Sequence, residues 1–197
     1  MAEAHEELEH AEHAQHASHT NRKVALMIAV MALFLAISEM LGKSAQTEAV
    51  SLNIQASDTW NFFQAKTIRQ TAVRTAAEGT TLQLPLTADA TTKEAMAKQI
   101  KAWTDTVARY ESDPKEMDGR KELRAHAEAL EHERDTQLAR YHNYELSSAA
   151  FQIGIVLSSA AVITGMFLLA WLAGGVALIG LAFTAIGLIA PTLVHLG

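Results

Sequence analysis

The chain contains no cysteine among its 197 residues, and it contains only three prolines. Without cysteine it has no disulfide framework and no thiolate for catalysis or metal binding. Charge is missing from the C-terminal part as well, because no Lys, Arg, Asp or Glu follows Glu145. The sequence also has no catalytic triad, paired-carboxylate site or glycine-rich phosphate loop. Nothing in it indicates the chemistry of an enzyme, and we expect a non-enzymatic protein with no certain cofactor.

A concentrated basic surface is also missing. The formal net charge is −6, residues 1–21 hold five Glu and no Lys or Arg, and residues 43–145 hold 14 basic against 16 acidic side chains. A protein that binds nucleic acid needs a basic face that displaces counterions from phosphates. We therefore expect no nucleic-acid partner.

Three uncharged, apolar stretches dominate what is present. About 20 apolar residues cross the hydrocarbon core of a bilayer, and the tail after Glu145 is long enough for two such helices. A third uncharged run covers residues 24–38. The predicted fold class is an all-α membrane protein with three transmembrane helices. An acidic His-rich leader covers residues 1–22, and the three spans cover residues 23–42, 146–165 and 168–190. The region between the first two spans is 43–145, and a short C-terminal tail is 191–197.

The leader does not resemble a cleavable signal peptide. Signal peptides begin with basic residues and end at a small-residue cleavage site, whereas this leader is acidic and Glu39-Met40-Leu41 follows the first apolar run. The first span is therefore expected to remain in the membrane as an anchor.

Residues 43–145 are predicted to form a long antiparallel helical stalk between the first and second spans. Gly and Pro are absent from residues 43–78 and again from residues 120–153, which favours two long helices. Gly79 is expected to begin a loop. Thr91 and Glu94 have the spacing of a capping box, which predicts a helix over residues 92–111.

Aromatic residues and an apolar stripe indicate how the stalk packs. The short helix carries its stripe at spacings of four and three, from Met96 to Tyr110. The aromatic side chains expected in the stalk core are Trp60, Phe62, Phe63 and Trp103.

Two glycine-containing sites, Thr164-Gly165 and Gly174-Gly175, could hold the turn between the last two spans. Small residues that recur at helical spacing continue through the second site. Because small residues let transmembrane helices approach closely, we favour a turn at residues 164–167 and a third span that ends before Pro191.

Each predicted span has one such stripe of small residues. The three stripes indicate close helix packing, within one subunit or between subunits. Their residues are Ala25, Ala29, Ala32 and Ala36 in the first span, Gly154, Ser158, Ala161 and Gly165 in the second, and Ala173, Ala177, Gly180, Thr184 and Gly187 in the third.

Apart from Lys23 at the very start of the first span, Glu39 is the single ionisable residue within the predicted spans. It follows Ala36 by three residues, so it shares that stripe and is expected to face other helices. An ionisable group in a membrane is by default a functional candidate, here for handling ions. Lys43 lies four residues later, and a Glu–Lys pair at this spacing also stabilises a helix without any further role. Both interpretations are kept.

Histidine recurs at every third position of the leader, at His10, His13, His16 and His19. On a helix, adjacent members of this series are neighbours, and imidazole binds divalent transition metals such as zinc, nickel and copper. Histidine also titrates near neutral pH, so protonation could offset the acidic charge. The third interpretation is a solvated acidic segment without a ligand.

One segment resembles a known family. Residues 56–66 read Ala-Ser-Asp-Thr-Trp-Asn-Phe-Phe-Gln-Ala-Lys. Together with the His-rich leader and the two C-terminal spans, this segment resembles a bacterial membrane-protein family described only as a domain of unknown function. The resemblance implies one span, a helical insert and two further spans. It implies no activity and no catalytic residue.

Orientation follows from the basic residues near the span ends. Arg22 and Lys23 favour a cytoplasmic N-terminus, although Lys43, Arg134 and Arg140 lie on the other side. We expect a multi-pass protein of the bacterial inner membrane with its stalk in the periplasm.

The expected function is structural. The stripes of small residues favour a protein that self-associates in the lipid bilayer as a scaffold or an accessory subunit of a larger membrane complex. The alternative is an oligomeric cation channel or metal-linked transport protein, with Glu39 around a pore and the histidines recruiting cations.

Overall fold

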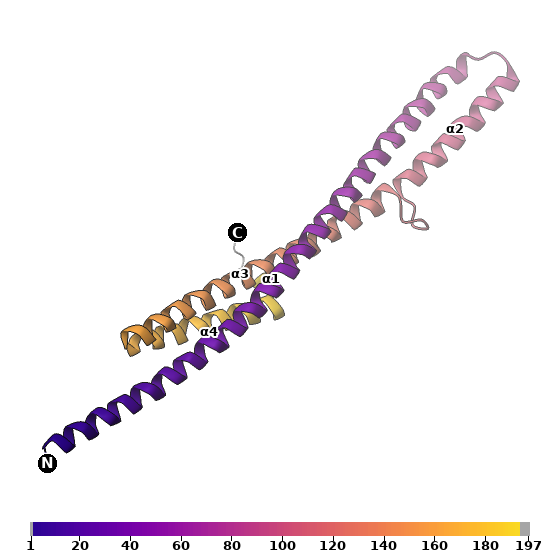
Figure 1. Cartoon of the computed structure of the whole chain (residues 1–197). Helices are drawn as coiled ribbons and strands as arrows, with labels where there is room; N and C mark the ends of the chain where they lie inside the picture. The colour runs from indigo at the N-terminus through magenta and orange to yellow at the C-terminus, as the bar shows by residue number, and fades with distance from the viewer. Residues whose placement is uncertain (1, 194–197) are drawn as a thin grey trace. The chain divides into compact units, whose positions relative to one another are not determined.

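The computed structural model describes residues 2–193, and it describes side chains from Arg22 onward. All of the regular structure in this described part is helical (Figure 1). The elements in chain order are α1 (Ala2–Gln83), the 3₁₀ helix η1 (Leu84–Leu86), α2 (Ala90–Glu111), α3 (Arg120–Thr164), α4 (Phe167–Ile189) and the 3₁₀ helix η2 (Pro191–Leu193).

The chain divides into two compact units. The first, here called the terminal unit, combines Met1–Glu48 with Thr136–Gly197, and the second, the middle unit, is Ala49–Asp135. Helices α1 and α3 contribute residues to both units.

Three helices of the structure are long and apolar enough to cross a membrane, by length and composition. They lie within Arg22–Leu86, Arg120–Thr164 and Phe167–Ile189. Only 17%, 39% and 22% of their most apolar stretches are buried inside the protein. Most of this apolar surface therefore faces outward, which is the pattern of helices that pack in lipid rather than in a water-soluble core.

In the terminal unit, residues 24–48 of α1 pack against the last part of α3 and against α4. Phe34 of α1 stacks on Phe151 of α3 with ring centroids 5.9 Å apart, and Phe151 is 1% exposed. α3 and α4 run side by side in opposite directions (Figure 1). The core of this unit is the line along which the three helices meet.

The turn between α3 and α4 lies where the sequence predicts it. Helix α3 ends at Thr164 and α4 begins at Phe167, while Gly174 and Gly175 lie inside α4. Gly165 has φ of +68° and its N–H bonds to the carbonyl of Ala161, 3.0 Å away. Glycine adopts this left-handed conformation without the Cβ clash of other residues, which ends the helix.

In the middle unit, α2 and the first part of α3 pack against the later part of α1. Leu52, Ala56 and Leu130 form a buried apolar cluster. Trp60, Phe63 and Trp103 are half-buried, as expected for the stalk core, whereas Phe62 is 44% exposed. The prediction is therefore wrong for Phe62, whose ring lies at the surface with Nζ of the buried Lys66 5.6 Å from the ring centre.

Two predicted boundaries in the middle unit are wrong. α1 does not stop at Gly79 but continues to Gln83. The hydroxyls of Thr80 and Thr81 donate to the carbonyls of Ala76 and Ala77, which satisfies these polar side chains within the helix. A single exposed glycine costs a helix only about 1 kcal/mol.

The second correction concerns the start of α2. Asp89, not Thr91, is its N-cap, because the carboxylate of Asp89 accepts hydrogen bonds from both the backbone N–H and the hydroxyl of Thr92. These bonds lower the pKa of Asp89. Helix α2 otherwise covers the predicted range and ends before Pro114.

Candidate functional site

The best candidate site is a polar groove between α1 and α3 in the terminal unit. Its volume is about 510 Å³. α1 contributes Glu39 and Lys43, and α3 contributes Glu145 and Gln152. Two carboxylates, one ammonium group and several amide and hydroxyl groups thus line one surface, next to the apolar stretches of both helices. The remaining lining residues are Ser38, Gly42, Gln46, Tyr141, Tyr144, Ser148 and Ala149.

Glu39 lies at the exposed edge of this groove. Its Oε1 accepts a hydrogen bond from Nε2 of Gln152 over 3.4 Å. Among the residues that the structure describes, Glu39 forms no ion pair with Lys43. The link between Glu39 and α3 therefore replaces the Glu–Lys pair within α1 that the spacing suggested.

Ser38 connects the groove to a buried cluster of three hydroxyls, one from each helix of the terminal unit. Its Oγ lies 3.1 Å from Oγ of Ser147 on α3 and 3.2 Å from Oγ1 of Thr184 on α4. Ser147 and Thr184 are 2.6 Å apart, and their hydroxyls lie 2.8 and 3.1 Å from the carbonyl oxygen of Gly180, which accepts a hydrogen bond from this pair. Ser38 and Ser147 are completely buried.

Hydrogen bonding accounts for the presence of this cluster in an apolar bundle. A buried hydroxyl without a partner costs free energy, while each of these three has at least two partners. Interhelical hydrogen bonds between membrane helices contribute about 0.6–2 kcal/mol each. The cluster therefore fixes the register of α1, α3 and α4 at one level of the bundle, beside the groove.

Asn143 continues the polar line one turn earlier on α3. Its Nδ2 donates to the carbonyl of Pro191 over 3.0 Å, which ties α3 to the chain after α4. Asn143 is 1% exposed, and its Oδ1 has no hydrogen-bond partner among the described residues.

Sequence reasoning identified Thr184 but missed Ser38 and Ser147. Ser147 precedes the second stripe of small residues by one heptad, so extension of that stripe toward the N-terminus would have included it. Ser38 lies seven residues after Met31 and on the same buried face of α1. On α1, the seven-residue spacing of Met31 and Ser38 marks the face that packs on α3 and α4, and the alanine stripe does not.

The small-residue stripes of α3 and α4 lie at the contacts between these two helices and α1. Gly154, Ser158, Ala161, Ala173, Gly180, Thr184 and Gly187 are buried, Ala177 is half-buried and Gly165 is exposed in the turn. A Cβ placed on Gly180 would lie 3.1 Å from the ring of Phe151. On Gly187 it would lie 2.8 Å from the ring of Tyr144. Glycine at these positions makes room for aromatic rings of α3.

The stripe of the first span lies on a different face. Ala25, Ala29, Ala32 and Ala36 are all exposed in the terminal unit. The residues of α1 that are buried instead are Val24, Met31 and Ser38. The alanine face is therefore not buried against α3 and α4.

The middle unit contains a second polar cluster. The side chain of Lys66 is 7% exposed, and its Nζ lies 2.5 Å from Oδ2 of Asp118 and 5.3 Å from the ring centre of Tyr110. This ammonium group is therefore held by a carboxylate and by ring faces, with Phe62 on another side.

Arg120 forms the other half of this cluster, at the first residue of α3. Its guanidinium donates to Thr67 and Gln70 of α1 and to Glu111 of α2. The hydrogen bond from Gln70, and then the charge of Arg120, lower the pKa of Glu111 against the opposing effect of desolvation. Lys66 and Arg120 thus join α1 to the ends of α2 and α3, which gives Lys66, the last residue of the segment 56–66, a structural role.

The predicted metal ligands of the leader are not described. Helix α1 passes through the leader, but the side chains of His10, His13, His16 and His19 lie outside the described residues. Within the described part of the chain, no group of three His, Asp or Glu side chains has the arrangement of a metal site.

The fold and the groove define an all-helical protein with three helices of membrane-spanning length. The chain belongs to the family named Domain of unknown function (DUF4337), whose model matches residues 20–190. This match confirms the kind of family that the segment around Trp60 indicated. No curated protein and no solved structure matches the chain.

Proposed function

We propose that this chain is a non-enzymatic, multi-pass membrane protein that self-associates and serves as a scaffold or an accessory subunit of a membrane complex. The main support is the alanine face of α1, which the described part of the chain leaves exposed. Association of helices in lipid depends on close van der Waals packing of small residues. The small-residue faces of α3 and α4 are largely buried by contacts within the subunit. The alanine face of α1 is therefore the one that can pack against a second copy of the chain.

Exposed apolar residues of the middle unit support the same proposal. Val50 and Ile54 are each 56% exposed, and Ile68 is 70% exposed. They lie beyond the apolar run of the first span, in a segment rich in polar residues. Val50 and Ile54 lie one helical turn apart, and exposed apolar side chains that adjoin one another are typical of protein interfaces.

The membrane location is part of the proposal. Arg22 and Lys23 precede the apolar run of α1, and we propose that they lie on the cytoplasmic side of the bacterial inner membrane. The middle unit then lies in the periplasm. Carbonate washing of cell envelopes should leave the protein in the membrane pellet.

Cysteine cross-linking in native membranes tests the self-association. Because the chain has no cysteine, single replacements give one thiol each. Ala29→Cys and Ala36→Cys should form covalent dimers under mild oxidation, since close packing of the alanine face brings equivalent positions together. The matched controls are the neighbouring positions Val30→Cys and Ile37→Cys, which are exposed on a different face of the same helix.

Two results would contradict the proposed interface. One is equal cross-linking at the alanine and control positions, which would indicate random collisions. The other is a monomer at every concentration in mass photometry of the detergent-solubilised protein.

The polar groove favours a second candidate function, a cation channel or a metal-linked transport protein. Glu39 and Glu145 line the same groove, and their carboxylates are the groups that attract cations. For this candidate, Glu39→Gln should reduce cation flux into proteoliposomes severalfold, because a neutral amide removes that charge. Lys115→Gln, a change on the loop between α2 and α3, is the control. Equal flux through the wild type and Glu39→Gln rules this candidate out.

A further inference from the structure

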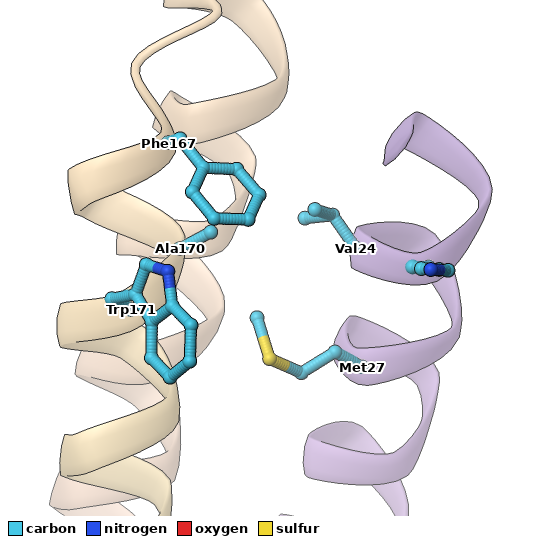
Figure 2. Close-up of a pocket in the computed structure, with 6 residues that line it drawn as sticks. Val24, Met27, Phe167, Ala170 and Trp171 are labelled. Carbon is cyan, nitrogen blue, oxygen red and sulfur yellow. The ribbon is translucent and has the colours of Figure 1, made fainter. Parts of the chain in front are cut away.

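A cavity with one charged group lies between the start of the apolar run in α1 and the first turns of α4. Its volume is about 260 Å³. Figure 2 shows Phe167, Ala170 and Trp171 of α4 on one side of it, facing Val24 and Met27 of α1 on the other. Lys23 also lines the cavity.

The walls are suited to a hydrocarbon chain. Val24, Met27, Phe167 and Ala170 present carbon atoms or a thioether, and no carboxylate lines the cavity. The rings of Phe167 and Trp171 pack edge to face, 6.2 Å apart. Both residues are more than half exposed, so the cavity is open along the outward face of the helices, where lipid would lie.

The polar part of the cavity is suited to an anion. The ammonium group of Lys23 is accompanied by Arg22, and residues 1–21 contain no other Lys or Arg. Basic residues and tryptophan next to an apolar helix mark the level of the lipid headgroups. A cation is disfavoured here because Lys23 has no acidic neighbour in the lining.

We propose that this cavity binds an anionic phospholipid, with the phosphate at Lys23 and one acyl chain along Met27 and Trp171. The size supports a part of a long molecule rather than a whole small ligand, since pockets that enclose drug-sized ligands measure about 300–1,000 Å³. A soluble anion would leave the apolar walls in contact with water. The proposal rests on the membrane location proposed above.

Native mass spectrometry of the full chain in detergent tests it, with phosphatidylglycerol and phosphatidylcholine of identical acyl chains as probes. The wild type should retain phosphatidylglycerol preferentially. Lys23→Gln should lower its affinity about fivefold, since one basic residue near the headgroups contributes about 1 kcal/mol. Lys43→Gln removes the same charge at the other end of the first span and should have a much smaller effect.

A second pair of variants tests the acyl-chain part. Ala170→Phe places a ring in the cavity and leaves Lys23 in place, so it should reduce the retention of both lipids. Ala182→Phe adds the same ring at an exposed position of α4 away from the cavity, and it should bind lipid as the wild type does. Glycerol phosphate at millimolar concentration should not compete.

Three results would overturn the lipid site. They are equal loss of phosphatidylglycerol in Lys23→Gln and Lys43→Gln, unchanged binding in Ala170→Phe, and full competition by glycerol phosphate. Carbonate washing and the cross-linking of Ala29→Cys show whether only the lipid site is absent or whether the proposed membrane location and self-association are absent as well. A protein that stays in the membrane and cross-links, but shows any of these three results, lacks only the lipid site.

Discussion

Replacement of Gly180 by leucine should destabilise the terminal unit by about 2–3 kcal/mol, which is near the upper end of the roughly 1–3 kcal/mol typical of overpacked cores. A Cβ at this position would already lie 3.1–3.3 Å from three carbons of the Phe151 ring. Phe151 is 1% exposed and stacks on Phe34 of α1, so its ring has no free space to enter. Thermal unfolding in detergent, followed by near-ultraviolet circular dichroism, measures the effect.

The glycine pair inside α4 provides the matched control. A Cβ on Gly174 or Gly175 would have nothing within 4 Å. Gly174→Leu and Gly175→Leu should therefore be neutral or slightly stabilising, because leucine favours a helix over glycine by up to about 1 kcal/mol. Phe151→Ala combined with Gly180→Leu should recover part of the stability that Gly180→Leu alone loses, because the smaller side chain leaves room for the leucine. Equal stability of Gly180→Leu and Gly175→Leu would contradict the packing of α3 on α4.

These glycines illustrate how far the sequence alone could reach. The small-residue pattern of α4 required a helix through Gly174 and Gly175 and a turn near Gly165, and both features are present. The pattern arises because the backbones of two helices can approach closely only where the residues between them are small. Periodicity along one helix is local information, so it is readable without the structure.

The alanine stripe of α1 shows the limit of the same reasoning. Its spacing matches that of the other two stripes, but α3 and α4 pack on the face that carries Met31 and Ser38 instead. Periodicity identifies a face and does not identify its partner. The partner depends on which side chains of three separate helices fit together, as Ser38, Ser147 and Thr184 do.

The polar clusters were not predicted because their members are far apart in the sequence. Lys66 and Asp118 meet only because the helix α2 brings the chain back along α1. In the sequence, the segment 56–66 stands out for its aromatic residues, which are predicted to form stalk core. The structure adds a role for Lys66 at the end of this segment, because its ammonium group lies over the ring of Phe62.

Removal of the Asp118 carboxylate should destabilise the middle unit, because it leaves the ammonium group of Lys66 buried without a counter-charge. Asp118→Ala should cost about 2 kcal/mol, less than the roughly 3–5 kcal/mol of a fully buried pair, since the Asp118 side chain is 43% exposed. Hydrogen exchange of the full chain, read on peptides that cover Lys66 and Arg120, reports the loss.

Two further variants decide whether the cost comes from the unpaired charge. Lys66→Met combined with Asp118→Ala removes both charges and should recover most of the lost protection, because methionine fills the site between the aromatic rings without a charge to desolvate. The exposed pair of Lys101 and Asp105 on α2, with side chains 79% and 67% exposed, is the control. Asp105→Ala should cost no more than about 0.5 kcal/mol, as surface pairs one helical turn apart do. If the double variant is as unprotected as Asp118→Ala, the carboxylate acts through its own packing, and the pairing with Lys66 does not stabilise this unit.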